Sequence, residues 1–197
     1  GSQTWRAEQQ RFERAVIERA SVPTTPRRTQ DRGAERAAVE ARCDPERPFA
    51  NEPDSDFTVA ANRRWIAEHL ARDRPADRPP LIDTVAGIDA VVARARGAER
   101  WRTTSTAERR VVLARAAAHM ATGRGRTIAV MAHETGKTVR EGDPEVSEAV
   151  DFTRWAAECT RELDELAADG VAAEPFGVVL VAGPWNFPTA IPTNGAV

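Results

Sequence analysis

The sequence predicts an α/β protein in which a mainly helical body comes first and a buried strand follows. Apolar residues recur at helical spacing from about residue 59 to residue 169, which predicts a series of amphipathic helices. Residues 177–182 then form a continuous apolar run rich in β-branched side chains. A run of this kind, without alternation of polar and apolar residues, is typical of a parallel strand that is buried on both faces.

The first 58 residues are predicted to form a tag remnant, an N-terminal helix and a connector between domains. A helix is expected over residues 4–20 and a short one over residues 34–43. Residues 21–33 and 44–58 combine prolines with polar residues and show no periodicity, which is typical of connecting segments. We therefore expect residues 1–58 to pack poorly as an independent unit.

The helical body is expected to extend over residues 59–176. Ser105 and Glu108 match a capping box, in which the serine oxygen accepts an orphan backbone N–H and the glutamate reaches back. Asp143-Pro144 is expected to open the last long helix, because proline is favoured in a first helical turn. The expected helices cover residues 59–72, 84–97, 106–121, 125–134 and 143–166. The candidate buried side chains of the first helix are Val59, Trp65, Ile66 and Leu70, and the second is expected to carry Val85, Ile88, Val91 and Val92 on one side. The later helices carry the apolar residues Leu113, Ile128, Met131, Val146 and Val150.

The predicted strand is followed by a stiff turn, Gly183-Pro184-Trp185-Asn186-Phe187-Pro188, and then by a further helix start. Helices followed by a buried strand and such a turn predict the entrance to a Rossmann-like domain, where ligands bind at the carboxyl ends of strands. A stiff turn can hold the Asn186 amide as a preorganised donor for an oxyanion. The residues alone leave a second interpretation open, namely a structural turn capped by the asparagine.

Composition argues against several classes of function. The chain of 197 residues has 28 basic and 30 acidic side chains, so no basic excess is available to neutralise nucleic-acid phosphates. No apolar run reaches the roughly 18 residues that a membrane helix needs. Cys43 and Cys159 form no disulfide framework, so a reducing, cytoplasmic setting is expected. Neither cysteine is predicted to be a nucleophile, since no base is placed beside it.

Two further motifs are assigned structural roles. Thr135-Gly136-Lys137-Thr138 is similar to the end of a P-loop, but Met131 stands where that motif needs glycine. We interpret Gly136 as the end of a helix, with Lys137 beside the exposed carbonyls. His133-Glu134 lacks the second histidine of a zinc-binding helix, and no metal site is predicted.

Several motifs, taken in order, resemble the aldehyde dehydrogenase superfamily. The segment from Phe176 to Val181, followed by Pro184 to Pro188, is similar to a family signature. Upstream, Trp101 with residues 105–109, the segment 134–138 and the segment 145–152 are similar to earlier family helices. The resemblance covers residues 84–193. The sequence differs from the family pattern at Asn194, where relatives commonly carry glycine. It implies an aldehyde dehydrogenase-like fold, in which residues 177–197 begin a Rossmann-like NAD-binding core.

A narrower resemblance lies in the connector. Residues 49–56 (Phe-Ala-Asn-Glu-Pro-Asp-Ser-Asp), followed by residues 61–63, resemble the entry to the dehydrogenase half of the bifunctional proline utilization A (PutA) family. Residues 26–32 resemble the connector of actinobacterial-type members. Members join a flavin-dependent proline dehydrogenase to an L-glutamate-γ-semialdehyde (1-pyrroline-5-carboxylate) dehydrogenase. FAD is expected only if a proline dehydrogenase domain precedes this segment in the parent protein.

The resemblance implies a reaction and a set of site residues. A cysteine thiolate attacks the aldehyde, hydride passes to NAD⁺, and a glutamate activates water to hydrolyse the thioester. Of this machinery the chain carries Asn186 in the oxyanion role. Ala182, Gly183, Pro184 and Trp185 match the segment that lines the ribose side of the cofactor. The resemblance implies that the nucleophile and general base belong to later sequence, so we expect the segment alone to be inactive. The parent protein is expected to be a homo-oligomer that acts on a small aldehyde.

Two alternatives to a semialdehyde dehydrogenase stay open. Another aldehyde dehydrogenase subfamily would show the same opening motifs. A non-catalytic module that serves oligomerisation or regulation would also carry them without turnover. The sequence does not decide between NAD and NADP.

Overall fold

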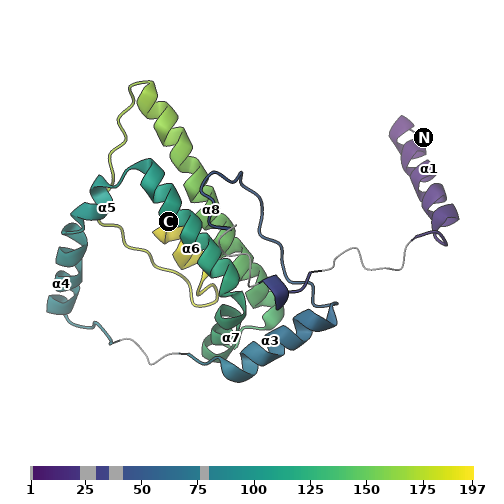
Figure 1. Cartoon of the computed structure of the whole chain (residues 1–197), viewed down its shortest axis with the longest axis horizontal. Helices are drawn as coiled ribbons and strands as arrows, with labels where there is room; N and C mark the ends of the chain where they lie inside the picture. Colours follow the sequence, from purple (N-terminus) through teal and green to yellow (C-terminus); the bar gives the residue numbers. More distant parts are fainter. Residues whose placement is uncertain (1, 23–29, 36–41, 76–79) are drawn as a thin grey trace.

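A computed structural model describes residues 2–22, 30–35, 42–75 and 80–197 (Figure 1). These residues contain helices and irregular segments but no β-strand. The helices are α1 (Gln3–Glu18), α3 (Ala60–Arg72), α4 (Val85–Arg96), α5 (Glu99–Thr103), α6 (Thr106–Thr122), α7 (Arg124–Thr135), α8 (Val139–Ala168) and α9 (Ala190–Ala196). The mainly helical character and the expected order of helices are therefore confirmed, and the expected strand is not. The predicted helix over 34–43 falls largely outside the described residues.

The core lies where α6 and α7 pack against α8 and α3 packs against α7 (Figure 1). Ile66, Ile128, Met131 and Val146 form one buried apolar cluster, as the helical spacing predicts. The α6–α8 contact is built from small residues, with Ala117, Ala121 and Val150 buried together. Small side chains allow the two helix axes to approach closely, and this contact holds α8 against the body.

Helix α8 begins earlier than the sequence predicts. Thr138 and Glu141 form a capping box, with the Thr138 hydroxyl and backbone N–H both reaching the Glu141 carboxylate. The helix therefore starts at Val139, and Pro144 lies inside it rather than at its first position. Pro144 removes one backbone donor close to the helix start, which a helix of 30 residues with a buried face tolerates. The capping box predicted at Ser105 and Glu108 is present.

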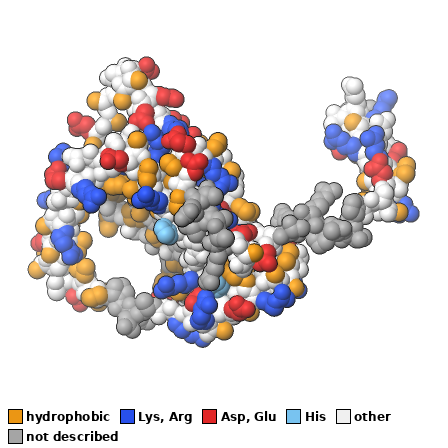
Figure 2. Space-filling view, in the orientation of Figure 1, with side chains coloured by type: hydrophobic (Ala, Val, Ile, Leu, Met, Phe, Trp, Pro, Cys, Tyr) orange, Lys and Arg blue, Asp and Glu red, His pale blue; other side chains and the backbone are white. Residues whose placement is uncertain are grey.

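Helix α4 forms where it is expected, but its apolar side is not buried. Val85 is 75% exposed and Ile88 is 52% exposed, and no residue of α4 is buried. Figure 1 shows α4 and α5 on the side of the molecule away from the α3–α7 contact, and Figure 2 shows hydrophobic side chains at the surface there. Helical periodicity predicts which residues share a face, but the burial of that face requires a partner element.

The apolar run over residues 177–182 is extended irregular chain and not the predicted buried strand. Leu180 is 91% exposed and Val179 is 62% exposed. A strand is stabilised by backbone hydrogen bonds to neighbouring strands, and no such partner lies beside this run among the described residues. The run contacts α9, because Gly195 lies so close to Val181 that a Cβ there would be 2.6 Å from a Val181 methyl carbon.

The segment before α3 divides into two parts. Helix α1 lies apart from the other helices (Figure 1), and its Trp5 and Phe12 are largely exposed. The described residues between 30 and 58 instead lie against α3, α7 and α8, and they contribute buried side chains to the body. Within the described residues, no helix is long and apolar enough to cross a membrane. The domain boundary at residue 58 stays a prediction.

Candidate functional site

The turn over residues 183–188 is held on the surface of α8 by one buried carboxylate. Glu145 of α8 is 1% exposed, and its Oε1 accepts the backbone N–H groups of Thr189 at 2.7 Å and Ala190 at 3.1 Å. Within the turn, the N–H of Phe187 donates to the carbonyl oxygen of Pro184 at 3.2 Å. Two bonds from a single buried side chain fix the chain immediately after the turn.

Lys137 ties the same carboxylate to the turn itself. Its Nζ donates to Glu145 Oε2 at 2.5 Å and to the backbone oxygen of Asn186 at 2.7 Å. The ammonium also lies 4.3 Å from the centre of the Phe187 ring, a cation–π distance. Gly136 ends α7 in the left-handed conformation, with φ of 72°, as predicted. The prediction for Lys137 is wrong, because its ammonium turns to Glu145 and Asn186 rather than to the carbonyls that end α7.

A pocket of about 480 Å³ opens between the turn and the α7–α8 junction. It is lined by Thr135, Gly136, Lys137, Glu141, Pro144, Trp185, Asn186 and Phe187. Within the described part of the chain, the Asn186 side-chain amide makes no hydrogen bond, so both of its donors are available to a ligand. The geometry therefore presents a fixed backbone that carries an unengaged amide at the edge of a pocket.

The five residues predicted from the sequence occupy different positions around this pocket. Trp185 and Asn186 line it together, and Trp185 is 73% exposed. Ala182, Gly183 and Pro184 are exposed and precede it in the chain without lining it. Gly183 has a packing reason to be glycine, since a Cβ there would lie 2.5 Å from the Pro192 ring.

Sequence reasoning missed Lys137 and Glu145 as residues of this site. The sequence predicts Lys137 at the end of a helix and Glu145 within a family-like helix, so it indicates neither as a residue of this site. One signal was present in the composition, because Lys137 is the only lysine of the chain, whereas every other basic side chain that is permanently charged is arginine.

A second cluster of charged side chains binds the connector to the body. Glu52 accepts from Arg42 at 3.0 Å and from Arg154 of α8 at 3.1 Å, and Arg124 of α7 lies 3.5 Å away. Asp143 of α8 accepts from the backbone N–H and hydroxyl of Ser55, both at 2.6 Å, and from Arg124 at 3.1 Å. Buried charges require such partners, and these ones come from three separate parts of the chain.

The pKa of Glu52 lies below its ordinary value of 4.5. Burial raises this pKa, but the positive charges of Arg42, Arg124 and Arg154 act against burial and outweigh it. For Arg124, burial is the largest influence and lowers the pKa of the guanidinium, while Asp143 and Glu52 raise it. The cluster is therefore a set of mutually dependent charges.

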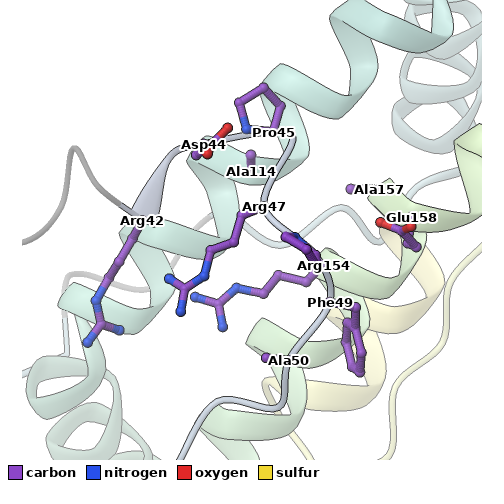
Figure 3. Close-up of a pocket in the computed structure, with 11 residues that line it drawn as sticks. Arg42, Asp44, Pro45, Arg47, Phe49, Ala50, Ala114, Arg154, Ala157 and Glu158 are labelled. Carbon is purple, nitrogen blue, oxygen red and sulfur yellow. The ribbon is translucent and has the colours of Figure 1, made fainter.

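Figure 3 shows the pocket beside this cluster, between the connector and α8. Arg42, Arg47 and Arg154 point into the same region, and the Phe49 ring meets Trp155 edge to face at 5.4 Å. The space there is about 30 Å³, against about 480 Å³ for the pocket beside Asn186. This region serves to attach the connector.

Both cysteines are partly buried. Cys159 lies partly buried in α8, where burial first and then the charge of Glu162 raise the pKa of its thiol. A raised pKa disfavours the thiolate, which is the opposite of what a nucleophilic cysteine needs. Cys43 is a free, partly buried residue of the connector.

The sequence pattern of the aldehyde dehydrogenase family matches residues 79–197. The 1-pyrroline-5-carboxylate dehydrogenase 2 of Bacillus subtilis is 34% identical over 73% of this chain and 36% of its own length. The 1-pyrroline-5-carboxylate dehydrogenase 1 of Halalkalibacterium halodurans is 28% identical over 76% of this chain and 37% of its own length. The chain thus spans about a third of the length of the curated relatives that it matches.

Solved structures of related proteins superpose on this chain. Proline utilization A (PutA) from Corynebacterium freiburgense superposes with a TM-score of 0.64 at 31% identity, over 98% of this chain and 18% of that protein. A 1-pyrroline-5-carboxylate dehydrogenase superposes with a TM-score of 0.59 at 23% identity, over 76% of this chain and 38% of that one, which shows a shared fold. On the family match over most of its length, the chain belongs to the aldehyde dehydrogenase family.

Proposed function

We propose that this chain is the N-terminal part of an NAD-dependent L-glutamate-γ-semialdehyde dehydrogenase, which oxidises the semialdehyde to glutamate. The observation that carries the proposal is the Asn186 amide, presented unengaged at a pocket on a backbone that Lys137 and Glu145 hold. The names of the relatives, which are 1-pyrroline-5-carboxylate dehydrogenases, supply the substrate class.

Asn186 acts in this proposal as an oxyanion donor. When a thiolate attacks an aldehyde carbon, the carbonyl oxygen gains negative charge, and a positioned N–H donor stabilises that charge more than it stabilises the substrate. The donor must not need reorganisation at the moment of reaction. The turn meets this requirement because Lys137 bonds it at Asn186 and Glu145 bonds the chain directly after it at Thr189.

The residues before Asn186 suit one side of a dinucleotide site. Ala182, Gly183 and Pro184 are exposed extended chain, so their backbone groups are accessible, and the Trp185 ring is open for stacking or packing. NAD, when bound, supplies a hydride acceptor for the oxidation. The role of these residues is to orient the cofactor beside the Asn186 donor.

The parent is further proposed to be a bifunctional protein of the proline utilization A type. The PutA structure superposes on 98% of this chain, whereas the 1-pyrroline-5-carboxylate dehydrogenases cover only 76%. The additional coverage supports the assignment of residues before α3 to a connector of that type. A flavin-dependent proline dehydrogenase would then precede it, with FAD as its cofactor, in a cytoplasmic homo-oligomer.

The 197-residue chain alone is proposed to be inactive. Covalent aldehyde oxidation requires a thiolate beside a base, and the raised pKa of the Cys159 thiol makes it unsuitable. Incubation with NAD⁺ and the semialdehyde should give no NADH. NADH formation that disappears in a Cys159→Ser variant would refute this.

The test of the proposed function uses the full-length enzyme and its Asn186→Ala variant. We expect the full-length protein to reduce NAD⁺ with L-glutamate-γ-semialdehyde in preference to simple aliphatic aldehydes. Loss of one oxyanion donor should lower kcat by about 10²–10³-fold while NAD affinity stays within about 2-fold to 3-fold. The matched control is Asn194→Ala, an exposed asparagine of α9 that does not line the pocket. A folded Asn186→Ala variant with near-wild-type kcat would contradict the oxyanion role.

A further inference from the structure

Lys137 connects helix α8 to the turn that carries Asn186. Its single Nζ atom bonds a carboxylate oxygen of α8 at 2.5 Å and the Asn186 carbonyl oxygen at 2.7 Å. The side chain of Lys137 is 12% exposed, and that of Glu145 is 1% exposed. The ion pair is therefore shielded from water, and each charge depends on the other.

Glu145 completes the attachment from the other side of Asn186. Its second oxygen, Oε1, accepts from the N–H groups of Thr189 and Ala190. The backbone is thus bonded at Asn186 through Lys137 and at Thr189 and Ala190 through Glu145, by two side chains that are bonded to each other. Rotation of the peptide that carries the Asn186 side chain would break one of these bonds.

The identity of residue 137 fits this role. The chain uses arginine for every other permanently charged basic side chain, and it has lysine only here. An ammonium is a compact point charge with three donors, whereas a guanidinium is a planar fork suited to bidentate pairing. At this site one group bonds both the Glu145 carboxylate and the Asn186 backbone carbonyl and also lies 4.3 Å from the centre of the Phe187 ring. A compact ammonium satisfies all three contacts from one atom.

We propose that Lys137 and Glu145 are positioning residues for the dehydrogenase reaction, which hold the Asn186 peptide so that its side-chain amide is aimed at the reacting oxygen. The proposal rests on the oxyanion role of Asn186 set out above. Lys137 lines the pocket, but in this proposal both residues act through Asn186. A misplacement of about 1 Å in a catalytic group is enough to lower a rate by about 10²-fold, so the contribution to kcat is large.

A double-mutant cycle in the full-length enzyme tests this coupling. Lys137→Met should lower kcat by about 10-fold to 100-fold with NAD affinity little changed. In the Asn186→Ala background the same substitution should change kcat by less than about 2-fold, because the residue through which it acts is gone. Arg126→Met, which removes an exposed cation of α7 that does not line the pocket, is the matched control and should leave kcat unchanged.

The outcomes separate this proposal from the proposed function. If Asn186→Ala leaves kcat unchanged, the oxyanion role fails. If Asn186→Ala lowers kcat but Lys137→Met does not, or lowers it by the same factor in both backgrounds, the positioning role alone is overturned.

A second variant guards against loss of folding. Lys137→Met leaves the buried Glu145 carboxylate without its counter-charge, so its melting temperature is measured alongside kcat. Lys137→Met/Glu145→Gln removes both charges, while the glutamine oxygen is able to accept from Thr189 and Ala190. This variant should fold and should still lose the kcat contribution. Wild-type kcat in the folded double variant would overturn the proposal.

Discussion

The connector over residues 51–56 and the run over residues 177–182 show opposite relations between polarity and burial. The connector segment is polar and acidic, yet Glu52 is 5% exposed and Ser55 is 9% exposed. The run is apolar throughout, yet Leu180 is 91% exposed. Polarity alone would predict an exposed connector segment and a buried apolar run.

The difference lies in the partners that each segment finds. Arginines of α7, α8 and the connector surround Glu52, and Asp143 and Asp151 of α8 accept backbone N–H groups from Ser55 and Glu52. These contacts compensate the buried carboxylates of the cluster, whereas the Nε of Arg124 is buried without a hydrogen-bond partner. The run over residues 177–182 needs neighbouring strands to satisfy its backbone, and the described residues supply none. Burial follows the supply of partners as much as it follows hydrophobicity.

The largest effect is expected from breaking the connector cluster. Glu52→Ala leaves Arg42, Arg124 and Arg154 without their shared counter-charge, two of them with less than a fifth of the side chain exposed and Arg124 fully buried. Loss of one partner from a buried pair costs about 3–5 kcal/mol, so thermal unfolding should shift markedly to lower temperature. Glu8→Ala, on the exposed helix α1, is the control and should change stability by less than about 0.5 kcal/mol. Equal melting temperatures for the two variants would show that the cluster does not attach the connector.

A matched pair of apolar substitutions sharpens the same comparison. Ile128→Ala removes a side chain that is 1% exposed in the core and should destabilise the chain by about 2–5 kcal/mol. Leu180→Ala removes a side chain of similar size from the exposed run and should cost less than about 0.5 kcal/mol in the same 197-residue chain. Denaturant unfolding of the two variants measures both values. A comparable loss for Leu180→Ala would mean that the run is packed.

A smaller effect is expected from acid. The pKa of Glu52 is lower in the folded chain than its ordinary value of 4.5, so its contribution to stability is fully present above pH 4.5. That contribution is lost as the pH falls through the lower folded-state pKa. The free energy of unfolding should therefore decrease below about pH 4.5, and less steeply in Glu52→Gln than in the wild type. Parallel pH profiles for the two proteins would exclude Glu52 as a source of the acid sensitivity.

The parts of the fold that local rules govern are the parts that the sequence predicts. The Ser105 capping box and the burial of Ile66, Ile128 and Met131 need only helical spacing and cap chemistry. The start of α8 is mispredicted because the sequence contains two helix-start signals. The helix begins at the Thr138 capping box, and Pro144, the other signal, lies inside it. The exposure of α4 is missed because periodicity carries no information about whether a partner element is present.

The candidate site is predictable only in its most local part. The turn around Asn186 is recognisable from its own residues, because prolines and an asparagine stiffen a short segment. The attachment of that turn depends on Lys137 and Glu145, which lie 49 and 41 positions earlier in the sequence. No spacing rule joins residues so far apart, and only the packing of α7 against α8 brings them to one place.

Amide hydrogen exchange of the 197-residue chain, resolved by residue, tests the central comparison most directly. The N–H of Ser55 donates to the buried Asp143 carboxylate at 2.6 Å, whereas those of Val179 and Leu180 have no acceptor among the described residues. We expect the Ser55 amide to exchange at least about 10²-fold more slowly than either of the other two after correction for intrinsic rates. Equal protection of Leu180 and Ser55, or rapid exchange of Ser55, would contradict the account that partners rather than polarity decide burial in this chain.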